Sequence, residues 1–225
     1  MIKSIDDKKE LLIKHTKQLR ERFSALELVE LEPGRFVVKG NLGFRVPYNG
    51  KIIEDDYDIE IQIPDDYPHS PPDVKEVGDK IPKNVDFHVN VSNGTLCLGA
   101  PLAVKTTFGR QRNLLWFVEK QLVPFLFGIS YKLKYGKLPF GELSHGGEGL
   151  LEHYKEVFAI NDEAIALEFL RMLAGGNYDE HSMCPCGRDL KIKKCHRKVL
   201  KKARNKQSPE EFQKEYWSIL MFLSR

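Results

Sequence analysis

Residues 63–72 read Ile-Pro-Asp-Asp-Tyr-Pro-His-Ser-Pro-Pro, and residues 87–98 read Phe-His-Val-Asn-Val-Ser-Asn-Gly-Thr-Leu-Cys-Leu. Four prolines between positions 64 and 72 restrict their own φ angles and those of their predecessors, so a stiff and extended connection is expected here. Asn93-Gly94 is a turn signal just before Cys97, which predicts that this thiol lies at the edge of a loop. Taken alone, Leu96-Cys97-Leu98 also fits a core segment with a small buried cysteine.

The residues before this stretch predict one helix followed by a strand meander. Apolar residues at near-helical spacing favour an amphipathic helix over 4–28. Three later segments favour strands, and short connections such as 48–51 make antiparallel pairing the expectation. These predicted strands cover residues 35–46, 52–63 and 74–77.

The residues after this stretch predict mainly helices. The chain loses periodicity over 79–112, and the apolar run 114–131 predicts a buried helix bent at Pro124. A further amphipathic segment follows Gly146-Gly147, and Asn161 or Asp162 is a candidate cap for a helix that runs to about residue 173.

The glycines at 175 and 176 suggest a domain boundary, which gives domains 1–176 and 177–225. Ser208-Pro209-Glu210-Glu211 predicts a capped final helix. Its apolar face is expected to contain Phe212, Tyr216, Leu220 and Leu223.

The composition is that of an ordinary globular protein. Hydrophobic residues make up 41% of the 225 residues, a length that suits one or two domains. Charged residues and a proline interrupt the apolar run 114–131, so no membrane span is expected, and the first residues have no apolar signal region. The expected location is therefore the reducing cytoplasm. In that compartment four cysteines indicate metal binding or catalysis and not disulfides.

Three of these cysteines form a metal-ligand pattern with a histidine. Three thiolates and one imidazole complete a tetrahedral shell for Zn²⁺, which would make the metal structural. The alternative is three unrelated buried cysteines. The motif resembles the SEC-C zinc motif of the bacterial translocation motor and many other bacterial proteins, which implies zinc, partner docking and a bacterial source. The expected ligands are Cys184, Cys186, Cys195 and His196.

Positive charge is concentrated beside this cluster. Between residues 188 and 206, ten lysines and arginines are opposed only by Asp189, although the net charge of the chain is only +3. Such a segment either is simply solvated or docks on nucleic acid or an acidic protein surface.

The order of helix, strand meander, Tyr-Pro-x-x-Pro-Pro, His-x-Asn and Gly-x-Leu-Cys-Leu is similar to the core of the ubiquitin-conjugating enzymes over about residues 5–130. The resemblance implies an α+β fold and a cysteine-dependent acyltransferase. By this resemblance Cys97 carries a ubiquitin-like protein as a thioester, Asn90 organises the site and stabilises the oxyanion, and His88 is structural. The implied partners are an activating enzyme, a ubiquitin-like protein and a protein substrate.

The sequence also departs from the pattern of that family. Val89 stands where the family has proline, and Asn90 lies one residue closer to Cys97 than is usual. Such divergence is typical of bacterial relatives found in conjugation or antiphage operons. The segment around His145 has no counterpart, which leaves open whether His145 or His153 assists Cys97.

The residues also fit three other functions. The first is a non-catalytic adaptor that binds a ubiquitin-like chain. The second is a zinc-dependent binder of nucleic acid or ribosomes, with the basic segment as its contact surface. The third is a cysteine hydrolase that pairs Cys97 with His145.

Overall fold

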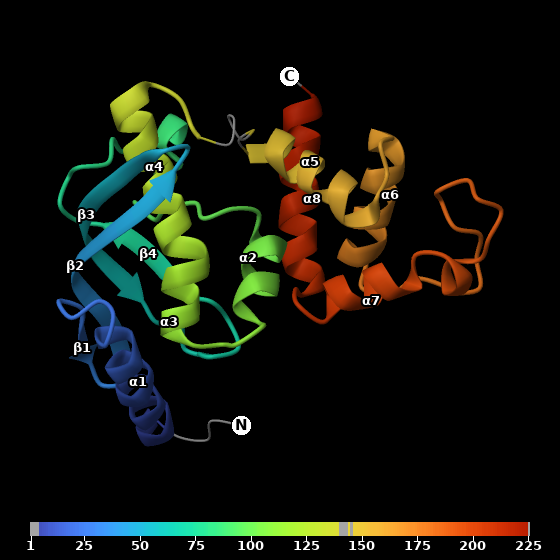
Figure 1. Cartoon of the computed structure of the whole chain (residues 1–225). Coiled ribbons are helices and arrows are strands. Elements are labelled where there is room, and N and C mark those ends of the chain that lie inside the picture. Colours follow the sequence, from blue (N-terminus) through green and yellow to red (C-terminus); the bar gives the residue numbers. More distant parts are fainter. Residues whose placement is uncertain (1–4, 140–143, 145, 225) are drawn as a thin grey trace. The chain divides into compact units, whose positions relative to one another are not determined.

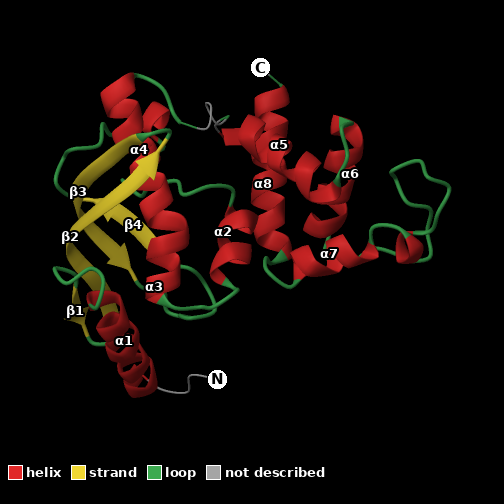
Figure 2. Cartoon of the chain, viewed as in Figure 1, coloured by secondary structure: helices red, strands yellow, loops and turns green. Residues whose placement is uncertain are grey.

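The chain folds into an α+β structure with a four-stranded antiparallel sheet, as expected (Figures 1 and 2). The computed structural model describes residues 5–139, 144 and 146–224. Two compact units divide the chain: residues 1–99 with 103–142, and residues 100–102 with 143–225. None of the described helices combines the length and the apolar character needed to cross a bilayer.

The first unit begins with a shorter helix than the sequence predicted. Helix α1 (Ile5–Arg20) ends well before residue 28, because the chain forms strand β1 (Glu27–Glu32) instead. This strand pairs with β2 (Arg35–Tyr48) through Glu27↔Lys39 and the residues that follow. Pairing with a neighbouring strand therefore overrides the helical spacing of the apolar residues.

The sheet is a simple meander in the order β1-β2-β3-β4. Strands β3 (Lys51–Gln62) and β4 (Asp73–Glu76) confirm the predicted strands apart from their exact ends. Along β3 the odd-numbered residues from Ile53 to Ile61 face the interior, and their even-numbered neighbours are more exposed. Asn49 and Gly50 adopt positive φ angles in the tight turn that joins β2 to β3, a conformation that this residue pair favours.

The predicted bent helix is made of three pieces. Helix α3 (Leu114–Phe117) leads into a π-helical turn (Val118–Leu122) and then into α4 (Val123–Tyr135). Pro124 lacks a backbone N–H, so the wider turn before it accommodates the missing helical hydrogen bond. Helix α4 packs on β2 and β3, and Figure 1 shows α3 and α4 lying across one face of the sheet.

The segment 79–112 is less irregular than expected. It contains the short 3₁₀ turn Val85–Phe87 and the helix α2 (Pro101–Phe108). Helix α2 has no charged residue in its first turn and only one complete repeat of apolar spacing, so periodicity gave no signal for it.

The second unit contains α5 (Gly146–Phe158), α6 (Glu163–Ala174), α7 (Arg197–Arg204) and α8 (Pro209–Leu223). The domain boundary predicted at residue 176 falls inside this unit. A short cysteine-containing segment has too little apolar surface to form a core of its own, so it shares one with α5 and α6. The shared core includes Tyr154, Phe158, Phe169, Leu200, Phe212 and Ile219.

Both predicted helix caps are present in this unit. The Asp162 side chain accepts a hydrogen bond from the Ile165 N–H at 2.9 Å. Ser208 and Glu211 form the expected capping box, with the Ser208 N–H donating to the Glu211 carboxylate at 2.9 Å. Residues near each helix start therefore determine these boundaries locally.

A buried histidine makes the stability of the first unit depend on pH. His15 Nδ1 and the Tyr67 hydroxyl are hydrogen-bonded at 2.6 Å, which joins α1 to the proline-rich connection. Burial, with a smaller effect from Lys14, lowers the pKa of His15 from its usual 6.5. The unfolded chain therefore binds a proton first as the pH falls, and the free energy of unfolding is expected to decrease from about pH 6.5 downward.

Urea unfolding at about pH 7.5 and pH 5.5, followed by Trp116 fluorescence in a Trp217→Phe background, checks this expectation. Burial also lowers the pKa of His153, which lies in the second unit. The comparison is therefore between the chain and its His15→Gln variant, in which the fall in stability of the first unit should be smaller. An identical fall in both proteins would contradict the prediction.

Candidate metal centre and cysteine hairpin

The four predicted ligands come together in the second unit. One ligand atom from each of Cys184, Cys186, Cys195 and His196 lies within 4.8 Å of the others. His196 Nδ1 is 3.2 Å from the Sγ atoms of both Cys184 and Cys195, and the Sγ atoms of Cys186 and Cys195 are 3.4 Å apart. Three sulfurs and one nitrogen at this spacing can hold a metal ion with tetrahedral coordination.

A small backbone hairpin positions the first two cysteines. The Cys184 N–H donates to the Leu190 carbonyl at 2.8 Å, and the Ile192 N–H donates to the Ser182 carbonyl at 3.0 Å. Between these bonds the chain turns through Gly187, whose φ of +75° is a conformation that suits glycine. The local sequence therefore presents two thiols on one side of a tight turn.

The other nitrogen of His196 determines how its ring is oriented. Nε2 lies 3.0 Å from the Phe158 carbonyl oxygen, a group that can only accept, so Nε2 carries the proton. The lone pair of Nδ1 is then free to face the sulfurs, as in metal sites whose histidine donates its second N–H to a carbonyl. Phe158 is 38 residues away in sequence, and no motif pointed to it.

The thiols strongly affect each other's ionisation. Burial, followed by hydrogen bonds and charge from Cys186 and Cys184, raises the pKa of Cys195 to about 12. Burial also raises the pKa of Cys184. At Cys186 burial acts in the same direction, but the Arg188 backbone N–H, the other two thiols and the Arg188 charge together outweigh it and lower the pKa. Three thiolates this close need a compensating cation, which a bound metal supplies.

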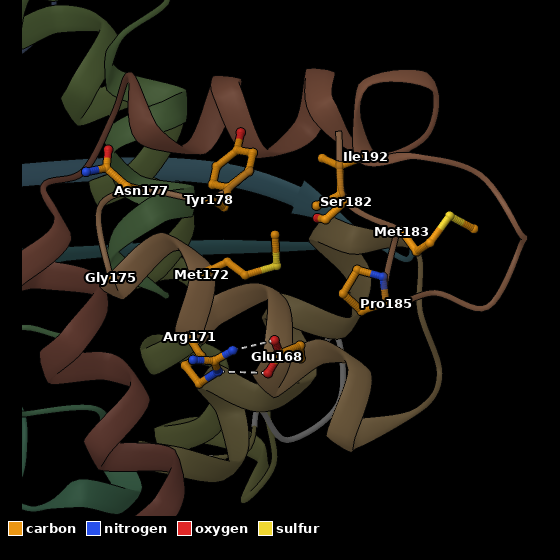
Figure 3. A pocket seen from close by; sticks show the side chains of 10 residues that line it. All are labelled: Glu168, Arg171, Met172, Gly175, Asn177, Tyr178, Ser182, Met183, Pro185 and Ile192. Atoms are coloured by element: carbon orange, nitrogen blue, oxygen red, sulfur yellow. Dashed lines mark hydrogen bonds and ion pairs between the residues drawn. The ribbon is translucent and has the colours of Figure 1, made fainter. Parts of the chain in front are cut away.

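A cavity of about 280 Å³ lies beside this cluster (Figure 3). Arg171 and Glu168 on α6 are joined there by two hydrogen bonds of 2.8 and 2.7 Å. The sequence gave no sign of the cavity, because α6 and the cysteine hairpin form it together. Its other lining residues are Met172, Gly175, Asn177, Tyr178, Ser182, Met183, Pro185 and Ile192.

Cys97 lies in the first unit, at the end of a second small hairpin. Val89 and Leu96 are antiparallel partners in this hairpin, and the Leu96 N–H donates to the Val74 carbonyl at 2.7 Å, which attaches it to β4. Val89 and Leu96 are buried, whereas Cys97 is exposed and lies outside the strands and helices. The predicted loop position of Cys97 is therefore confirmed.

The hairpin also carries the other two predicted residues. The Cys97 N–H donates to the His88 carbonyl at 2.7 Å, so these two residues are backbone partners. The exposed Asn90 is held by its amide, which donates to the Thr95 Oγ1 at 3.3 Å. The turn of the hairpin is closed by the Gly94 N–H, which donates to the Asn90 carbonyl at 2.7 Å. The fold therefore brings all three onto one short element.

The two candidate helpers of Cys97 are His145 and His153. His145 lies outside the described residues. His153 is on α5 of the second unit, where burial lowers its pKa.

A comparison of the sequence with models of known protein families gives no match, and neither does a comparison with curated proteins.

Proposed function

We propose that this protein is a conjugating enzyme for a ubiquitin-like protein, with Cys97 as the residue that carries the acyl group. The observation that carries the proposal is an exposed thiol at the end of a hairpin that directly follows a helix and a four-stranded meander. The resemblance of residues 5–130 to the conjugating enzymes supports the same reading. An exposed position suits a thiol that must meet two large protein partners in turn.

The proposed reaction consists of two acyl transfers. The Cys97 thiolate attacks the carbonyl carbon of a thioester on an activating enzyme, and the sulfur of that enzyme leaves as a thiolate. An acceptor amine then attacks the new thioester, the Cys97 sulfur leaves, and the amine gives up a proton to solvent. A thioester replaces a thioester in the first step, so the free energy changes little.

In this proposal the neighbours of Cys97 have distinct roles. Asn90 donates a hydrogen bond to the oxyanion that forms during attack, which an amide can do without titrating. One N–H of this amide donates to the Thr95 Oγ1 at 3.3 Å, and the second N–H is the one that would donate to the oxyanion. His88 is a positioning residue, because its carbonyl accepts the Cys97 backbone N–H at 2.7 Å and fixes the end of the hairpin.

We propose further that the metal at Cys184, Cys186, Cys195 and His196 is Zn²⁺ and that it is structural. All four positions of a tetrahedral ion are filled by protein ligands, so none remains for a water or a substrate. Free thiols at both sites require a reducing compartment, for which we propose the cytoplasm.

The test is thioester formation on a non-reducing gel. The chain is incubated with ATP and with its cognate activating enzyme and ubiquitin-like protein. The expected result is an adduct that disappears on thiol treatment and is absent from Cys97→Ala. Cys97→Ser should give an adduct that survives thiol treatment, because the ester then forms through oxygen.

Failure of the natural chain to form an adduct, with partners that form a thioester with each other, would contradict the proposal. The adaptor function would then be favoured if the chain still bound the ubiquitin-like protein. An adduct of equal yield in Cys97→Ala would show that another residue carries the acyl group.

A further inference from the structure

The second unit presents a continuous run of exposed cations, which we call the basic face. It consists of α7 and the adjoining segment 188–194. Asp189 is the only acidic residue between positions 188 and 206. The exposed members of the basic face are Arg188, Lys191, Lys193, Lys194, Arg197, Lys198, Lys201, Lys202 and Arg204.

The helical period of α7 separates its buried and basic residues. Leu200 and Ala203 are buried in the core of the second unit. Lys198, Lys201 and Lys202 are exposed, and the last two lie three and four residues after Lys198, so each of them is a neighbour of Lys198 on the helix surface. Like charges at this spacing repel each other, and a bound polyanion would relieve that repulsion.

Few of these charges are neutralised within the protein. Arg197 forms an ion pair with Glu180 at 2.6 Å, and the Arg204 guanidinium lies 5.6 Å from the centre of the Tyr178 ring. Within the described ranges, no carboxylate lies within 4.0 Å of the ammonium groups of Lys198, Lys201 or Lys202. These lysines are therefore available to an external anion.

The metal cluster holds this helix in a defined position. The ligands Cys195 and His196 directly precede Arg197, the first residue of α7. The Arg197–Glu180 pair ties the same end of the helix to the cysteine hairpin. The backbone that carries these cations is therefore a folded helix and not a flexible tail, which lowers the entropy lost on binding.

The composition of the basic face favours nucleic acid over an acidic protein. Protein interfaces have a desolvated centre rich in aromatic residues. Residues 179–206 contain no Phe, Tyr or Trp, and the preceding Tyr178 lies under the Arg204 guanidinium. Recognition of single strands likewise relies on aromatic side chains that stack on bases. An array of lysines without aromatics suits the phosphate backbone of a duplex.

We propose that the basic face binds double-stranded nucleic acid through its phosphates, without sequence preference. This inference is independent of the thioester chemistry proposed for Cys97, which lies in the other unit. It gives the chain a means of localisation near nucleic acid. Binding should be electrostatic, with an affinity in the range of about 1–100 µM near physiological salt.

The experiment is a titration of a fluorescent duplex of about 24 base pairs with the full chain, followed by anisotropy at several KCl concentrations. The titration is done with a DNA duplex and with an RNA duplex, and a difference in affinity shows which of the two the basic face prefers. The variant is Lys198→Gln/Lys201→Gln/Lys202→Gln. It should bind at least about tenfold more weakly, and the slope of log K against log salt should become shallower by about 2–3.

A matched variant removes three exposed lysines from the first unit: Lys14→Gln/Lys17→Gln/Lys39→Gln. It has the same net charge as the α7 variant and should bind like the natural chain. Circular dichroism shows whether each variant is folded. No binding to either duplex at about 20 mM salt, equal weakening in both variants, or equal competition by poly-L-glutamate would each overturn the proposal.

Discussion

Removal of the zinc ion that we propose for the cysteine cluster is expected to unfold most of the second unit and to leave the first unit folded. Cys184 and His196 are buried, and they connect the cysteine hairpin to α7 and, through the Phe158 carbonyl, to α5. Without a cation, the buried Cys184 thiol and His196 imidazole, together with the neighbouring thiols, would lack this partner next to the apolar core of the unit. The structure would then lose the contacts that join these three elements.

The size of this effect follows from known structural zinc sites. Zinc binding contributes about 10–16 kcal/mol to the folding of small zinc peptides at neutral pH. The second unit has a shared helical core in addition to its cluster, so we expect a loss of several kcal/mol and not of the whole figure. Cys184→Ala should have a similar effect, because it removes one ligand from a filled shell.

The measurement is thermal unfolding by far-ultraviolet circular dichroism before and after a zinc chelator, with metal content determined by mass spectrometry. In a Trp217→Phe background, Trp116 fluorescence reports the first unit separately, because Trp217 lies on α8 of the second unit. Added Zn²⁺ should restore the chelated chain but not Cys184→Ala. Cys97→Ala is the matched control and should keep its metal. An unchanged melting curve in a metal-free chain would contradict the prediction.

Replacement of Gly147 by alanine is the second large effect that we expect. Gly147 lies in the first turn of α5, where it is buried against α8. A Cβ atom at this position would be 2.4 Å from the Ser218 carbonyl oxygen and 3.0 Å from the Ile219 Cα. Both atoms belong to the α8 backbone, so the two helices would have to move apart.

Overpacking of this kind typically lowers the free energy of unfolding by about 1–3 kcal/mol. Because the clash is with backbone atoms, we expect the loss in Gly147→Ala to lie at or above the upper end of that range. The separation would also disturb the buried bond from the Tyr154 hydroxyl to the Glu215 carboxylate, which are 2.5 Å apart across the same helix pair. Urea unfolding followed by circular dichroism measures the loss.

Gly128 on α4 provides the matched control. A Cβ atom there would meet only the Leu138 side chain, at an ordinary contact distance of 3.6 Å. Gly128→Ala should therefore be neutral or stabilise the chain by up to about 1 kcal/mol, because alanine favours a helix. An equal loss of stability in both variants would show that helix packing at Gly147 is not the cause.

The sequence by itself predicted the features that depend on nearby residues. The alternation along residues 52–63, the turn at Asn49-Gly50 and the caps at Asp162 and Ser208 are all present. The spacing of the cysteines and the histidine likewise predicted a metal cluster, because short loops and turns bring such ligands together. The catalytic role of Cys97 remains a prediction, since it rests on a resemblance and an exposed position.

Tertiary structure alone decided the features that depend on distant residues. The helix predicted over 4–28 ends at Arg20, and residues 27–32 form β1, because β2 offers unpaired backbone groups next to them. The boundary predicted at residue 176 lies inside a unit, since the cysteine segment buries its apolar residues against α5 and α6. The Phe158 carbonyl orients His196 across 38 residues. Packing determines each of these, because burial and hydrogen bonding join groups that the sequence holds far apart.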